Sequence, residues 1–176
     1  MYVLKIQGLY LNGTTDSEIN SVTVVNSTIG FMKLTAIEGT SLSPRILKLS
    51  NLNCKDSLYE NPLNIIEIEG ILTTENFQIQ IIQSSFQNLK FILGGNLILM
   101  KSQMINYLLL QDSSFESISG GSISIESFDK LNTAVTSHLR IQNLTTLDIN
   151  SQFSSFLQVS KEGELSIYDS TIKNIY

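Results

Sequence analysis

The chain of 176 residues contains one cysteine, one histidine, two prolines and no tryptophan. A single cysteine cannot form an internal disulfide, so no covalent crosslink within the chain holds the fold together. Free cysteine is among the most buried residue types, and we therefore interpret Cys54 as a core residue rather than as a nucleophile.

Charge is also sparse, because only 15% of the residues are charged and the net charge is −5. The basic residues are scattered and include only two arginines, Arg45 and Arg140, so we expect no nucleic-acid partner. The apolar content of 42% excludes a disordered tail. The longest apolar stretch, residues 91–100, is about half the length that a membrane span needs and contains two glycines, so we expect no membrane span in this segment.

The beginning of the chain, MYVLKIQGLYLNGTT, lacks the charged start, apolar run and cleavage site of a secretory signal. The chain is therefore either intracellular or a piece of a longer protein. Three sequons, at Asn12, Asn26 and Asn143, permit a secreted setting.

The segment LLLQDSSF recurs in related form along the chain. Six octamers share its pattern, at residues 22–29, 47–54, 79–86, 108–115, 139–146 and 165–172. Their starts are separated by 25, 32, 29, 31 and 26 residues, a loose repeat of about 29 that falls in the range typical of solenoids and propellers.

The first and third positions of every octamer are aliphatic, as in Leu108 and Leu110, whereas the second and fourth are mostly polar. This alternation predicts strands with one buried face. The fifth position is always Asn, Asp or Gln. Asn and Asp tolerate the left-handed backbone conformation and can bond their own main chain, as a tight bend between two strands requires. We interpret it as a corner ladder that consists of Asn26, Asn51, Gln83, Asp112, Asn143 and Asp169.

A second alternating strand follows most octamers, for example at residues 65–70 and 122–127, and long helical windows are missing. A leucine-rich repeat has a similar period but spends the rest of each repeat on helix or extended arc. We therefore predict an all-β fold, a parallel right-handed β-helix of about six turns of roughly 29 residues.

Residues 84–100 and 113–127, SSFQNLKFILGGNLILM and SSFESISGGSISIES, resemble the right-handed β-helices of the pectin-lyase-like class. More closely, they resemble the polymorphic outer-membrane-protein repeats of bacterial autotransporters and large ciliate surface proteins. That family follows a Ser-and-Phe segment with Gly-Gly-Ala-Ile, which Gly120 to Ile123 match with Ser in place of Ala. The resemblance implies this fold and a surface setting, not an activity.

The sequence offers few candidates for a catalytic or metal-binding site. His138 and Arg140 share one outer face, but no carboxylate in the same strand would orient the histidine, so we predict no catalytic residue. Glu67 and Glu69 also alternate outward, and we interpret them as a solvated strand face rather than as metal ligands. We expect no metal and no cofactor.

The outward residues of three successive octamers mix amides, aliphatics and an aromatic, the composition of a modest contact face for a protein or a glycan. This predicted contact face consists of Gln80, Ile82, Tyr107, Leu109, Gln111, His138, Arg140 and Gln142. We expect a structural or adhesive segment of a larger extracellular or cell-surface assembly that acts through protein–protein contacts. The alternative is a polysaccharide-binding or polysaccharide-cleaving β-helix, with a glycan as its ligand.

The chain starts with the strand-like YVLKIQGLYL and stops at STIKNIY, within a repeat. Open ends of a β-helix expose unpaired strand edges unless they are capped. We therefore expect residues 1–176 to form a single repeat array within a longer chain, whose ends meet further repeats of the same chain or other protein subunits.

Overall fold

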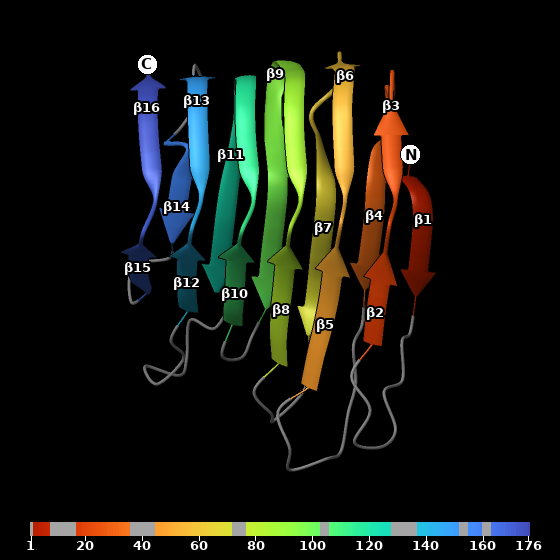
Figure 1. Ribbon diagram of the computed structural model, residues 1–176. Coiled ribbons are helices and arrows are strands. Elements are labelled where there is room, and N and C mark those ends of the chain that lie inside the picture. Colours follow the sequence, from red (N-terminus) through yellow and green to blue (C-terminus); the bar gives the residue numbers. More distant parts are fainter. Residues whose placement is uncertain are drawn as a thin grey trace.

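The computed structural model describes residues 2–7, 17–35, 45–71, 77–102, 106–127, 137–151, 155–159 and 163–176. All regular secondary structure in these ranges is β-strand, and all strand pairs are parallel. The strands form a β-solenoid, shown in Figure 1.

Two sheets contain the strands. The six-stranded sheet has β2 (Ser17–Asn20), β5 (Arg45–Ser50), β8 (Phe77–Ile82), β10 (Asn106–Gln111), β12 (Ser137–Gln142) and β15 (Glu164–Tyr168). The ten-stranded sheet has β1 (Tyr2–Gln7), β3 (Thr23–Val25), β4 (Gly30–Thr35), β6 (Asn53–Tyr59), β7 (Leu63–Ile71), β9 (Ser85–Ser102), β11 (Ser114–Ser127), β13 (Thr145–Asn150), β14 (Leu157–Val159) and β16 (Thr171–Ile175).

Each turn has an ascending and a descending part in the view of Figure 1. The chain ascends through a strand of the six-stranded sheet, passes a corner, ascends again and then returns downward. In β9 the first part pairs with the ascending β6 and the second part with the descending β7. The bend between them contains Gly94 and Gly95, with φ angles of 81° and 154°. Glycine is needed at Gly95 because a Cβ there would collide with the carbonyl oxygen of Leu63.

The all-β parallel solenoid confirms the predicted fold class, but the predicted number of turns is wrong. Each of the six strands in the six-stranded sheet belongs to one repeat. However, only the three turns β5 to β7, β8 to β9 and β10 to β11 have every strand paired on both sides. The structure therefore has about three fully enclosed turns, because counting octamers also counts the open turns at the ends. The right hand of the coil stays a prediction.

Five of the six octamers stack in the predicted register, but the one at 22–29 does not. Leu47, Ile79, Leu108, Leu139 and Leu165 are direct neighbours along the six-stranded sheet. The next neighbour of Leu47 is Ser17 rather than Val22, and Val24 pairs with Cys54. The first repeat thus begins five residues earlier than predicted, and Asn26 does not belong to the corner ladder.

The interior consists of aliphatic columns and stacked rings from both parts of each turn. Leu110 in the ascending part and Ile66 in the descending part have no exposed surface. The rings of Phe86 and Phe115 stack from turn to turn, with centroids 4.8 Å apart. Cys54 is buried, and burial raises the pKa of its thiol to about 12, so the thiol stays protonated at neutral pH.

Candidate functional site

The structure places all eight residues of the predicted contact face on the neighbouring strands β8, β10 and β12. Leu109 lies between Gln80 and Arg140, and Tyr107 lies beside His138. At the upper end of these strands Ile82, Gln111 and Gln142 are neighbours. Most of these side chains are half-buried and Arg140 is exposed. The face is therefore continuous, but nothing in its geometry identifies a ligand.

A carboxylate that the sequence analysis missed lies beside His138. Glu164 on β15 is its direct strand neighbour, and His138 Nδ1 is 3.2 Å from Glu164 Oε2. Ser166 Oγ donates to the other carboxylate oxygen over 3.2 Å. The sequence pattern assigned only Ser166 and Tyr168 of the neighbouring octamer to this face, because that octamer starts at Leu165. Counting one residue back from the inward-facing Leu165 would have found Glu164, because parallel strands in register align equivalent positions.

Two tyrosines and an arginine border this pair. The Tyr107 ring lies 6.3 Å from the imidazole of His138, and Arg140 Cζ lies 5.2 Å from the ring centroid of Tyr168, within cation–π range. Together with Leu139 and Ser166 these side chains line a shallow hollow of about 200 Å³ on β10, β12 and β15.

The hollow can bind small polar groups but has limited catalytic equipment. The imidazole and the carboxylate can donate and accept hydrogen bonds, and the guanidinium can hold an anion. The side chains of His138 and Glu164 are 33% and 67% exposed, so water screens their interaction. Among the described residues no group of three or more His, Cys, Asp or Glu side chains could hold a metal ion.

The corner positions of all repeats have a left-handed backbone. Their φ angles lie between 48° and 59° for Ser21, Asn51, Gln83, Asp112, Asn143 and Asp169. In all of these residues except Asp169, the backbone N–H donates a hydrogen bond to the next turn over 3.0 or 3.1 Å. The acceptor is the carbonyl of the residue that ends the neighbouring strand of the six-stranded sheet. Side chains also bond along the column, since Asn143 Nδ2 donates to Asp112 Oδ1 over 2.7 Å. The corner residues thus connect the turns.

A second column of residues with a left-handed backbone was not predicted from the sequence. Each of its members lies five residues after a corner residue. Its φ angles lie between 52° and 56° for Asn26, Asp56, Asn88, Ser117, Asp148 and Asn174. Asn88 Nδ2 donates to Asp56 Oδ1 over 2.9 Å, and Asn174 Nδ2 donates to Asp148 Oδ1 over 2.7 Å. The sequence carried the signal, because all six residues are Asn, Asp or Ser at a fixed offset from the corner.

Glu67 and Glu69 do not form the solvated face that the sequence suggested. Lys33 on β4 forms ion pairs with both carboxylates, 3.0 Å from Glu69 Oε2 and in close contact with Glu67 Oε1. Glu67 is only 6% exposed and also accepts a hydrogen bond from Asn64 Nδ2 over 2.6 Å. Burial lowers the pKa of Lys33, but the hydrogen bonds to both carboxylates outweigh it and raise the pKa above its usual value.

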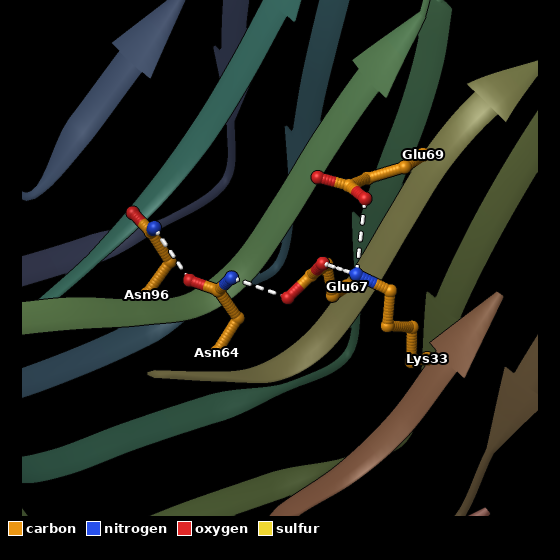
Figure 2. A network of polar contacts seen from close by, with 5 residues as sticks. All are labelled: Lys33, Asn64, Glu67, Glu69 and Asn96. Atoms are coloured by element: carbon orange, nitrogen blue, oxygen red, sulfur yellow. Dashed lines mark hydrogen bonds and ion pairs between the residues drawn. The ribbon is translucent and has the colours of Figure 1, made fainter. Parts of the chain in front are cut away.

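Figure 2 shows how this network continues across the strands. Asn96 Nδ2 on β9 donates to Asn64 Oδ1 on β7 over 2.7 Å, and Ser122 Oγ on β11 donates to Asn96 Oδ1 over 2.6 Å. Polar groups of four descending strands, β4, β7, β9 and β11, are thereby joined. These hydrogen bonds and ion pairs therefore connect successive turns.

In the described part of the chain, no helix is long and apolar enough to cross a membrane. Comparison of the chain with protein-family models, with curated proteins and with solved structures gives no match. The parallel β-solenoid therefore stands on the structure alone.

Proposed function

We propose that this chain is a structural or adhesive β-solenoid segment of a larger extracellular or cell-surface assembly and that it acts through protein–protein contacts. The observation that carries the proposal is the continuous outer face of β8, β10 and β12, where Ile82, Tyr107 and Leu109 lie among amides and charged side chains. A mixture of this kind is found on protein contact faces.

The polar side chains support the same function. The two left-handed columns and the Lys33 network bond from one turn to the next, so they stiffen the stack. A rigid stack suits an extended scaffold, with further repeats of the same chain or other subunits as partners. The resemblance to polymorphic outer-membrane-protein repeats supports the surface setting.

The test uses beads coated with the chain and intact cells of the source organism. We expect the coated beads to bind to the cells, and we expect Leu109→Asp on the contact face to reduce binding. Leu93→Asp is the matched control, because Leu93 is exposed but lies on β9, away from that face. Equal binding of coated and uncoated beads would contradict the proposal, as would antibody labelling that requires permeabilised cells.

A second candidate function, polysaccharide binding or cleavage, is favoured by the pair of His138 and Glu164. The imidazole would serve as a base oriented by the carboxylate, and Tyr107 and Tyr168 offer rings against which sugars stack. The test is a reducing-end assay on neutral and acidic polysaccharides. Activity that His138→Ala and Glu164→Gln both abolish, while Lys48→Met retains it, would replace the structural proposal with this one.

A further inference from the structure

The hollow on β10, β12 and β15 is polar, and its charges balance. Its lining contains one arginine, Arg140, and one carboxylate, Glu164. A ligand with a negative charge would meet Glu164, and a ligand with a positive charge would meet Arg140. Like charges that meet in a contact oppose binding. The hollow therefore favours a ligand without charged groups.

The same two side chains offer complementary hydrogen-bonding groups. Arg140 has only N–H donors, and Glu164 has only acceptors. The carboxylate accepts from Ser166 Oγ and contacts His138 Nδ1, which leaves acceptor positions on it because a carboxylate has about four. A hydroxyl group both donates and accepts. A ligand with several neutral hydroxyl groups therefore matches the hollow.

The guanidinium of Arg140 is positioned by a ring rather than by an ion pair. Its Cζ lies 5.2 Å from the ring centroid of Tyr168, within cation–π range. Among the described residues no carboxylate lies within ion-pair distance of Arg140. Packing on the ring restricts the side chain, while the edge of the guanidinium keeps its N–H donors. A donor that is already positioned loses less conformational entropy when it binds.

Tyr107 borders the other side of the hollow. Its ring lies 6.3 Å from the imidazole of His138 and is tilted by 39° against it. Tyrosine combines an apolar ring with a polar hydroxyl group. A sugar unit likewise has apolar C–H groups beside its hydroxyl groups, so it can make both kinds of contact here.

The hollow is too small to enclose a whole ligand, but the outer face continues from it along the solenoid. Its volume is about 200 Å³, whereas pockets that bury most of a drug-sized molecule measure roughly 300–1,000 Å³. Gln78 on β8 follows His138 and Tyr107 in one row, and Gln80 follows Arg140 and Leu109 in the next. From β15 to β8 the face spans three strand spacings, roughly 14 Å. It is thus longer than one sugar ring.

We propose that the hollow binds one unit of a neutral, hydroxyl-rich polysaccharide and that the polymer continues along the outer face of β12, β10 and β8. This inference rests on the second candidate function, restricts it to binding and names the ligand as neutral. Hydrolysis of a glycosidic bond uses two carboxyl groups in most enzyme families. Among the described residues that line the hollow, Glu164 is the one carboxyl group.

The first experiment is affinity electrophoresis of the 176-residue chain in gels that contain mannan, galactan, xylan or dextran. We expect at least one of these neutral polysaccharides to retard the chain. Arg140→Met should weaken this binding roughly tenfold or more, because the sugar loses hydrogen bonds from a charged donor. Lys90→Met removes the same charge at an exposed site of β9, away from the face, and should bind like the wild type. Circular dichroism checks that both variants fold.

The second experiment tests whether the charge balance selects the ligand. Polygalacturonate, an acidic polymer, should not retard the wild type. Glu164→Gln leaves Arg140 unbalanced, so this variant should gain binding to polygalacturonate and keep binding to the neutral polymer. Glu60→Gln removes the same charge at an exposed site outside the hollow and should gain no such binding.

Three results would overturn the inference. They are a chain that none of the four neutral polysaccharides retards, equal binding by Arg140→Met and the wild type, and equal behaviour of Glu164→Gln and Glu60→Gln in polygalacturonate. The bead experiment keeps this inference apart from the proposed function. A chain that binds no neutral polysaccharide but still attaches beads to cells would overturn the inference and leave the protein contacts standing.

Discussion

The side-chain amide of Asn143 donates a hydrogen bond to Asp112 Oδ1 over 2.7 Å and thereby joins two turns of the solenoid at the same corner. Both residues have left-handed backbones, with φ angles of 51° and 50°. Asn and Asp thus suit the corner for two reasons. They tolerate this conformation, and their side chains offer a donor and an acceptor along the stack.

Asn143→Asp should destabilise the fold at neutral pH by about 1–2 kcal/mol, because it replaces a charge-assisted hydrogen bond with two adjacent carboxylates. Urea unfolding at neutral pH measures the effect. Gln142→Glu adds a charge one residue away, beside Gln111 and Tyr168, and should cost much less; an equal cost would contradict the ladder.

The sequence predicted the strands of the interior turns well because each buries an aliphatic residue at two alternating positions. It failed in the first repeat, where β2 offers Ser17 and Ile19 at these positions while the segment from Val22 onward alternates more clearly. Period-two alternation cannot distinguish two adjacent strands that are separated by a corner. The pairing of β2 with β5 decides the register, and that is a long-range contact.

The candidate site was predicted less completely, for two physical reasons. The contact between His138 and Glu164 depends on strand register across 26 residues, which the local pattern does not show. Glu67 alternates outward as predicted, yet it is buried, because alternation gives the direction of a side chain and not what surrounds it. The partner Lys33 lies 34 residues away.

Gly95→Ala should lower the free energy of unfolding by about 1–3 kcal/mol, because the φ angle of 154° is unfavourable for other residues and the new methyl group would meet the Leu63 carbonyl. Thermal unfolding followed by circular dichroism measures the change. Leu93→Ala, two residues away and 59% exposed, serves as the control and should be nearly neutral. A neutral Gly95→Ala would show that the bend between the two parts of β9 is more adaptable than the structure indicates.

Lys33→Met should destabilise the fold at neutral pH and should matter less in alkali. The folded-state pKa of Lys33 is raised above its usual value of 10.5, so the network contributes fully below that pH and its contribution is lost as the pH rises through the folded-state pKa. We expect the difference in unfolding free energy between variant and wild type to shrink above about pH 10.5. A constant difference across this range would mean that the ion pairs do not stabilise the fold.

Lys48→Met provides the comparison, because Lys48 pairs with Glu18 at 3.2 Å but both side chains are more exposed, at 38% and 42%. Exposed pairs contribute about 0–1 kcal/mol, so this variant should be nearly neutral at all pH values. Tyr59, whose pKa burial raises to about 12, also destabilises the fold in alkali. Its effect is common to the wild type and both variants and cancels in the differences.

Leu110→Asp should unfold the stack, whereas His138→Ala should leave it almost unchanged. Leu110 is fully buried between its neighbours on β8 and β12, and an unpaired buried carboxylate costs roughly 3–5 kcal/mol. His138 forms an exposed pair with Glu164, which contributes about 0–1 kcal/mol. Leu109→Asp introduces the same carboxylate on the outer face of the same strand, between Gln80 and Arg140, and should fold normally. Urea unfolding of the three variants decides the matter, and a folded Leu110→Asp would mean that the ascending strands do not enclose a continuous apolar core.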